Sequence, residues 1–160
     1  MIDAIDKVAG LSADQELFRA RRFRPEFVEG AELCRLSVLR PQDDQGLATE
    51  LRLAVAHRIA TLNADPALVA DYAAQLAECH PSEELLALAG GETSLTQPLA
   101  ALARHCDLIT LTPDRAEASD ITLLEQAGLD NPQIVALSEL IAFINFQTRV
   151  AAGLRLMRSV

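Results

Sequence analysis

Apolar residues recur at steps of three or four along almost the whole chain. The clearest example is the stretch 47–62, whose spaced apolar residues are Leu47, Leu51, Val55, Ile59 and Leu62. Such spacing places these side chains on one face of a helix. No segment alternates apolar and polar residues with the period of two that marks a half-buried strand. The sequence therefore predicts an all-α fold.

Capping residues and prolines divide this pattern into about eight helices. Asp65–Pro66 and Asn131–Pro132 are typical helix starts, because Asp or Asn caps a first turn and Pro suits the first helical positions. Other helix starts are predicted after a capping box at Ser12–Gln15, at Pro25, at the apolar stripe beginning at Leu95 and at a cap at Ser119. Helix ends are predicted at Thr112–Pro113, at Gly128 and near Met157. Loops are predicted at residues 41–46 and Gly90–Gly91, and residues 80–84 end one helix and start the next.

The length of 160 residues, half of them apolar, predicts one domain with a real core. We expect residues 1–45 to form a helical extension on a core of residues 46–160. The apolar stretches are interrupted by charge, so no membrane span is predicted. The first ten residues carry acids instead of a basic segment, so we expect no secretory signal and a cytoplasmic location.

The formal net charge of −9 argues against nucleic acid as a partner. Four arginines, Arg19, Arg21, Arg22 and Arg24, form the main basic cluster. A solvated or ion-paired helix face is the simpler interpretation of this cluster, and an anion site is the alternative.

Three cysteines, Cys34, Cys79 and Cys106, are too few and too widely spaced to predict a disulfide framework. Cys106 falls in an apolar stripe, so we expect it to be buried and inert. Cys34 is expected in the core or at an interface. Cys79 precedes His80, but adjacent residues on a helix point about 100° apart, which is poor geometry for activating a thiolate.

The three histidines, His57, His80 and His105, lack the spacing that puts two ligands on one helix face. No metal site and no cofactor are predicted from them.

The C-terminal third resembles a known family. Residues 124–129 match an "L-x-x-A-G-L" pattern, and residues 142–154 match "A-F-x-N-F-x-x-R-x-A-x-G-L". Both are similar to the peroxidase-related branch of the alkylhydroperoxidase D (AhpD)-like / carboxymuconolactone decarboxylase (CMD) superfamily. The first forty residues resemble a cysteine-free sister group of CMD-domain proteins. The resemblance implies an AhpD-like orthogonal bundle of helices.

The residues 51–74 are similar to the core helix pair of that family, which reads "E-x-x-x-L-x-x-A-x-x-N-x-C-x-x-C-x-x-x-H". Aligning Asn63 with the asparagine of the pattern puts Asp65 and Leu68 at the two cysteine positions and Tyr72 at the histidine. Leu53 falls near the glutamate, and Glu50 comes three residues earlier. The family's peroxidase chemistry needs a dithiol that cycles through a disulfide. The resemblance therefore implies that this chain has lost that activity.

Three polar residues of this stretch, Asp65, Tyr72 and His57, each have a structural and a functional interpretation. Asp65 is explained as the N-cap of a helix, or it presents a negative charge to a pocket, where the family has a thiolate. Tyr72 is a core residue, or its hydroxyl faces the same cavity. His57 is a partly buried histidine within an apolar helix, or a general base.

Asn145 and Arg149 lie one turn apart in the last predicted helix, which is otherwise apolar. Polar groups in such a place need partners. We expect bonds to a neighbouring helix or subunit, with a role in a pocket as the alternative.

Three functions follow from these residues and the resemblance. The first is a non-redox homo-oligomer (dimer, trimer or hexamer) that serves as a binding or accessory protein. It assembles with itself or with a cysteine-bearing AhpD-like relative, and a small-molecule ligand is an additional candidate partner. The second is a thiol-independent decarboxylase-like or lactonase-like enzyme using Asp65, Tyr72 and His57. The third is a residual peroxidase using Cys79.

Overall fold

The computed structural model describes residues 1–159. Over this range the chain is all α, with nine α-helices, one 3-10 turn, η1 (Pro113–Arg115), and no strand. The helices are α1 (Ala4–Ala9), α2 (Glu16–Arg21), α3 (Pro25–Leu39), α4 (Thr49–Leu62), α5 (Pro66–Glu78), α6 (Glu83–Ala89), α7 (Leu99–Leu111), α8 (Ala118–Gln126) and α9 (Asn131–Arg158). The prediction of an all-α fold is confirmed.

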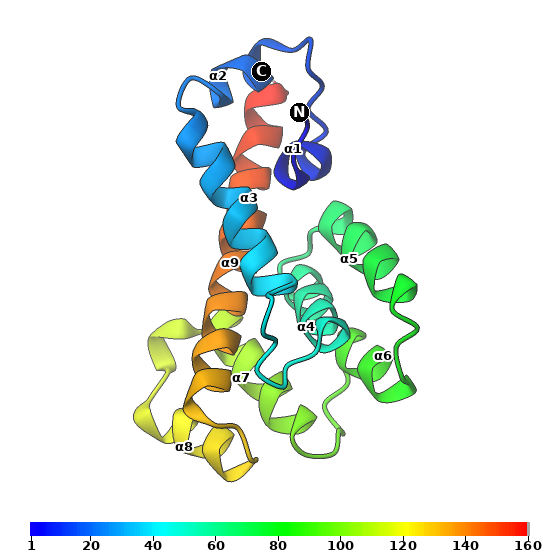
Figure 1. The fold of residues 1–160 in the computed structure, drawn as a ribbon, viewed down its shortest axis with the longest axis vertical. Coiled ribbons are helices and arrows are strands. Elements are labelled where there is room, and N and C mark those ends of the chain that lie inside the picture. The colour runs from blue at the N-terminus through cyan, green and yellow to red at the C-terminus, as the bar shows by residue number, and fades with distance from the viewer. Residues whose placement is uncertain (160) are drawn as a thin grey trace.

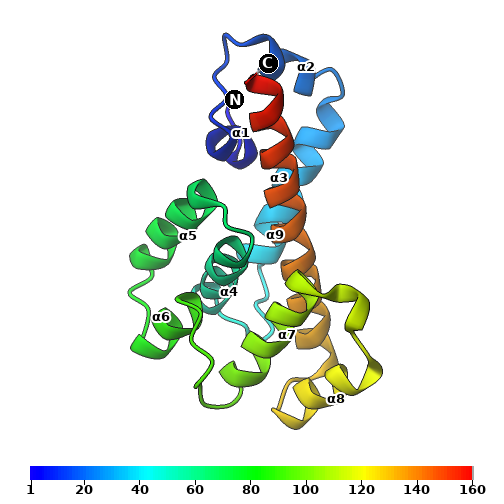
Figure 2. The same cartoon turned by 180° about the vertical axis from the view of Figure 1, so that it is seen from behind.

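The long helix α9 forms the axis of the molecule (Figure 1). Helices α7 and α8 pack near its start, α4 and α3 contact it further along, and α1 and α2 pack near its end (Figures 1 and 2). Helices α5 and α6 pack on α4. The two chain termini consequently lie together at one end of the molecule (Figure 1).

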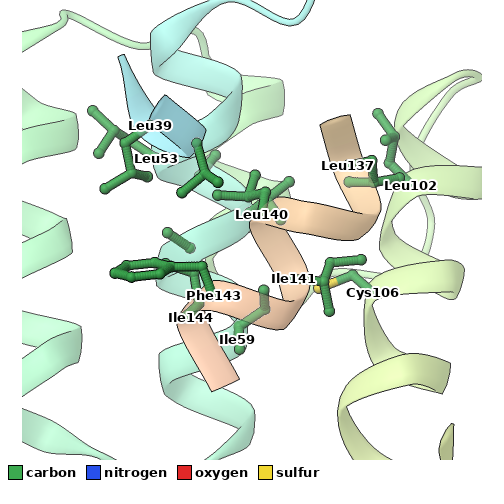
Figure 3. Packing of buried hydrophobic residues seen from close by; sticks show 14 of the residues in the cluster. Leu39, Leu53, Ile59, Leu102, Cys106, Leu137, Leu140, Ile141, Phe143 and Ile144 are labelled. Carbon is green, nitrogen blue, oxygen red and sulfur yellow. The ribbon is translucent and has the colours of Figure 1, made fainter. Parts of the chain in front are cut away.

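The core is centred on α4 and α9. Leu53 and Ile59 of α4 are fully buried, as are Ile141 and Ile144 of α9. Figure 3 shows these side chains together with Cys106, which α7 contributes from the opposite side of α9. Complete burial of one such aliphatic side chain contributes about 1.5–3 kcal/mol to folding. The apolar stripes seen in the sequence therefore meet in one body.

The structure has one helix more than the eight predicted, because α1 was missed. Asp3 caps α1 by accepting a hydrogen bond from the Asp6 backbone N–H at 2.8 Å, and the Asp6 carboxylate accepts one from the Asp3 N–H at 3.1 Å. Gly10 ends the helix in the left-handed conformation, at φ 69°. A helix of six residues is too short to show a helical period, so only these caps mark it.

The cap predicted at Ser119 is wrong. Ser119 lies inside α8, and Glu117 is the N-cap residue, in a reciprocal pair with Asp120. The helix predicted directly after Ser12–Gln15 begins at Glu16, and no side chain caps it.

The helix predicted from Leu95 begins at Leu99. Gln97 precedes Pro98, and the proline ring disfavours helical backbone in the residue before it. By contrast, α5 and α9 begin at the two sites where an acid or amide residue is followed by proline, as predicted.

Helix α9 alone, within the part of the chain that is described, is long and apolar enough by length and composition to cross a membrane. Of its most apolar stretch, 61% is buried inside the fold. A mostly buried core helix passes the same test, and α9 occupies the core position here.

Candidate functional site

Asp65, which aligns with the first cysteine of the family pattern, forms a hydrogen bond and an ion pair within the fold. Its carboxylate caps α5 by accepting a hydrogen bond from the Leu68 backbone N–H at 3.1 Å. The guanidinium of Arg155 donates to both carboxylate oxygens, at 2.9 and 2.8 Å. The N-cap interpretation of Asp65 is confirmed. Because Arg155 compensates its charge, Asp65 does not present a free anion to a pocket.

Leu68 and Leu53, at the second cysteine position and near the glutamate position, are fully buried members of the core. Neither side chain can ionise. Glu50 lies in the first turn of α4, whereas Asp65 follows the opposite end of that helix. A helix of fourteen residues is about 20 Å long, so the two carboxylates are far apart.

Tyr72 is buried, and its hydroxyl donates a hydrogen bond to the Oε1 atom of Gln147 on α9. Burial raises the pKa of the Tyr72 phenol. Tyr72 thus joins α5 to α9 as part of the core, and its hydroxyl bonds to a side chain of α9.

His57 lies half-buried on α4, and its Nδ1 atom is 2.9 Å from the carbonyl oxygen of Ala89. A carbonyl only accepts, so Nδ1 carries the proton in this contact. His57 therefore ties α4 to the end of α6. This agrees with the interpretation of His57 as a partly buried, satisfied histidine.

The three candidates for acid–base chemistry do not meet. The hollow beside Asp65 is lined by the ends of α4 and α5, and neither Tyr72 nor His57 reaches it. Each of the three bonds to a different partner, as described above. Acid–base catalysis needs groups within hydrogen-bond reach of one substrate, which this arrangement does not provide.

The three thiols are free and differ in exposure. Burial raises the pKa of the Cys106 thiol to about 12, so this cysteine is protonated and inert at neutral pH, as predicted. Cys79 is the C-cap of α5, and its Sγ donates to the backbone carbonyl of Gln75 at 3.6 Å. Cys34 is exposed on α3, so its predicted place in the core is wrong, and a place at an interface stays a prediction.

Asn145 bonds to neighbouring helices, as predicted. Its amide donates to the Thr110 hydroxyl of α7 at 3.3 Å, and its oxygen accepts from Asn63 at the end of α4, at 2.9 Å. Arg149 is exposed on the same helix. Asn145 therefore has a structural role in the core, whereas Arg149 is a cation at the surface.

The basic cluster is ion-paired at its centre. Arg21 and Arg22 contact the two carboxylate oxygens of Asp6 at 2.6 and 2.5 Å. Burial raises the pKa of Asp6, but hydrogen bonds from Arg22, from the Asp3 backbone and from Arg21 hold it below its ordinary value. For these two arginines the ion-paired interpretation is confirmed.

Two buried arginines on α4 escaped the sequence analysis. Arg52 donates to the backbone carbonyls of Val38 in the last turn of α3 and of Asp44 and Leu47 in the connection to α4, at 2.7–2.9 Å. Arg58 pairs with Asp107 of α7 and donates to the carbonyls of Leu88 and Glu92. Their position within an apolar helix was the available signal, since a charge there needs several partners.

A large apolar groove lies between α3 and α9. Its volume is about 580 Å³, and its main walls are Phe27, Cys34, Val38, Ala142, Phe143 and Phe146. Only Val38 and Leu39 of α3 are buried. Phe27 is 62% exposed and Phe146 is 46% exposed. The sequence did not reveal this groove, because α3 carries apolar residues on several sides.

Within residues 1–159 no three His, Cys, Asp or Glu side chains are grouped to hold a metal ion. In comparisons with known proteins, no family model matches the chain and no curated protein matches its sequence.

Proposed function

We propose that this protein is an AhpD-like/CMD member that works without thiol chemistry, as a binding or accessory protein that assembles with a second copy of itself. The observation that carries the proposal is the exposed apolar groove between α3 and α9. Here "the α3–α9 groove" means the hollow whose main walls are named above.

The exposure of the groove supports assembly. Phe27 and Phe146 together expose roughly 200 Å² of surface in and around the groove, at about 200 Å² per residue. Leu33 and Leu36 add exposed apolar surface on other sides of α3, at 65% and 41%. A stable dimer buries about 800 Å² on each partner. A second copy that seats its own α3 in the groove would extend the contact towards that size.

Small residues in the groove suit close packing of helices. A Cβ atom added at Gly30 would meet nothing within 4 Å in this chain. Ala31 and Ala142 line the same groove. Glycine in the middle of a helix costs about 1 kcal/mol relative to alanine. Close approach of a partner helix at Gly30 offsets that cost.

The residues at the matched redox positions support a non-redox role. Asp65 is held by Arg155 and by the first turn of α5, and Leu68 is packed in the core. An aspartate and a leucine cannot form a disulfide. The loss of the dithiol leaves the fold and its surfaces as the means of function.

The test is the mass of the protein in solution, measured by sedimentation equilibrium over a wide concentration range. We expect a dimer or larger assembly that Phe27→Asp and Phe146→Asp each weaken about a hundredfold, since leaving a carboxylate unpaired in an apolar contact costs about 3 kcal/mol. Leu111→Asp is the matched control, because Leu111 is 58% exposed on α7, outside the groove. Salt should strengthen assembly, because two copies of charge −9 repel each other.

A parent protein that stays monomeric at every concentration would overturn self-assembly. A peroxidase assay with a hydroperoxide and a dithiol tests the non-redox part separately. We expect the parent and Cys79→Ser to show the same background rate. A faster parent would show that Cys79 retains peroxidase chemistry.

A further inference from the structure

A second hollow, of about 320 Å³, lies between α7, α8 and the start of α9, apart from the α3–α9 groove. Its walls include the aliphatic side chains of Ile109 and Ile121. Its polar wall residues are His105, Glu117, Asp120 and Ser138. Binding pockets for small molecules have this character, with apolar walls and a few polar groups, and start at about 300 Å³.

His105 is the unexplained group in this hollow. Its side chain is 3% exposed, and its Nδ1 atom is buried with no hydrogen-bond partner in residues 1–159. An unpartnered buried polar group costs about 1–3 kcal/mol. Burial also lowers the pKa of the imidazole, although the nearby Asp120 raises it. A neutral imidazole has one nitrogen that accepts a hydrogen bond.

The other polar groups decide which ligand chemistry fits. Asp120 already accepts hydrogen bonds from Arg104 at 2.7 Å and from the Glu117 backbone N–H at 2.8 Å. The Ser138 hydroxyl donates its proton to the carbonyl of Ile134, so towards a ligand it can only accept. The neighbouring cation Arg104 is paired with Asp120. The polar side chains of the hollow therefore offer acceptors and negative charge, which disfavours an anion.

We propose that this hollow binds a small, mainly apolar molecule that carries one amine or hydroxyl donor, and that His105 accepts the hydrogen bond from that donor. One aromatic ring with a short polar arm fits within the hollow and suits its apolar walls. The proposal goes beyond self-assembly, because the two surfaces share no residue.

The test uses four probes of one shape: benzylamine, benzyl alcohol, toluene and benzoate. Binding is measured by titration, with the imidazole ¹⁵N shifts of His105 as the site-specific readout. We expect saturable binding of the amine and the alcohol, at least tenfold tighter than that of toluene or benzoate. The ¹⁵N shift of His105 should move with the same affinity.

Variants separate the role of the imidazole from that of the apolar walls. In His105→Phe the donor-bearing probes should lose their tenfold advantage over toluene, whereas His105→Gln, which keeps an acceptor, should retain part of it. His57→Gln is the control at a histidine outside this hollow. If His105→Phe fails to fold, Ser138→Ile tests the same site by filling the hollow from α9.

Three outcomes would overturn the proposal. One is the absence of saturable binding of the amine and the alcohol, which would mean that only water donates a hydrogen bond to His105. Another is unchanged discrimination between the probes in His105→Phe. The third is preferential binding of benzoate, which would contradict the charge argument.

Discussion

The contact between Tyr72 and Gln147 shows how a single polar pair becomes fixed inside an apolar core. Both residues are at most 1% exposed, and they lie 75 positions apart in the chain. The hydroxyl and the amide oxygen have no access to water, so each depends on the other. At the residue scale, position 72 therefore joins two helices where the resemblance expects a catalytic histidine.

Changing both partners together should cost less stability than the sum of the two single changes. We expect Tyr72→Phe and Gln147→Leu each to lower the free energy of unfolding by about 1–3 kcal/mol, because each leaves a buried polar atom unpaired. The double variant should lose about 1–2 kcal/mol less than the sum of the two, since no orphan remains. Urea unfolding of the four proteins gives the coupling energy. Strict additivity of the two changes would contradict the pairing.

At the scale of elements, buried arginines on α4 hold neighbouring helices in place. Arg58 is 2% exposed, and its guanidinium bonds to Asp107 of α7 through two atoms at 2.7 Å. The same side chain donates to the carbonyls of Leu88 and Glu92, which flank the end of α6. One residue thus sets the positions of two helices relative to α4. Its hydrogen bond with Asp107 raises the pKa of the Arg58 guanidinium, so it stays charged.

Loss of this guanidinium should be costly. We expect Arg58→Met to lower the free energy of unfolding by about 3 kcal/mol, because the buried Leu88 carbonyl and the partly buried Glu92 carbonyl and Asp107 carboxylate lose their donor. Arg58→Lys should fall between the parent and Arg58→Met, because it keeps the charge and loses the fork of donors.

Arg115→Met provides the matched control for Arg58. Arg115 is exposed in η1, and an exposed substitution there should change stability by less than about 0.5 kcal/mol. The measurement is chemical denaturation followed by circular dichroism. A loss at Arg58→Met no larger than that of the control would contradict the role given to this residue.

At the scale of the whole molecule, ion pairs and backbone contacts close the chain end to end. Arg155 of α9 donates to the Val8 carbonyl as well as to Asp65, and Arg158 donates to the Gly10 carbonyl at 2.6 Å. Asp6 of α1 receives Arg21 and Arg22. Arginines therefore help to hold the first residues to the end of α9, beside an apolar cluster of Ala9, Leu11 and Phe18 that packs with Leu154.

This closure predicts loss of stability in acid. The pKa of Asp6 is held below its ordinary value, so its contribution is fully present above about 3.9, the unfolded value, and is lost as the pH falls through the lower folded value. At neutral pH we expect Asp6→Asn to be about 2 kcal/mol less stable than the parent, because two arginines lose their anion. In acid the difference between the two proteins should shrink.

Thermal unfolding of the parent and of Asp6→Asn across this pH range measures that difference. His105 contributes a separate decline that begins near pH 6.5, because its pKa is also lowered by folding. The two declines are distinguished by their pH windows. Parallel stability profiles for the parent and Asp6→Asn would contradict the role of Asp6.

The sequence by itself determined the all-α class and most helix boundaries. Asp65–Pro66 is the clearest case, because a cap and a proline act on the backbone within one turn, and the structure starts α5 there. The burial of Cys106 was also readable, since it lies on an apolar stripe of its own helix. These predictions succeeded because each depends on residues within one turn or one helix.

Only the tertiary structure decided what each polar residue contacts. Tyr72 bonds to Gln147, and Arg58 bonds to Asp107 across 49 positions; neither partner is marked by local spacing. The exposed α3–α9 groove and the orphaned nitrogen of His105 depend equally on which helices pack nearby and which do not. Helix formation and the alignment of apolar residues on one helix face are set by neighbours within a few turns. Which apolar face stays exposed and which polar side chains pair are set by segments that meet only after the chain has folded.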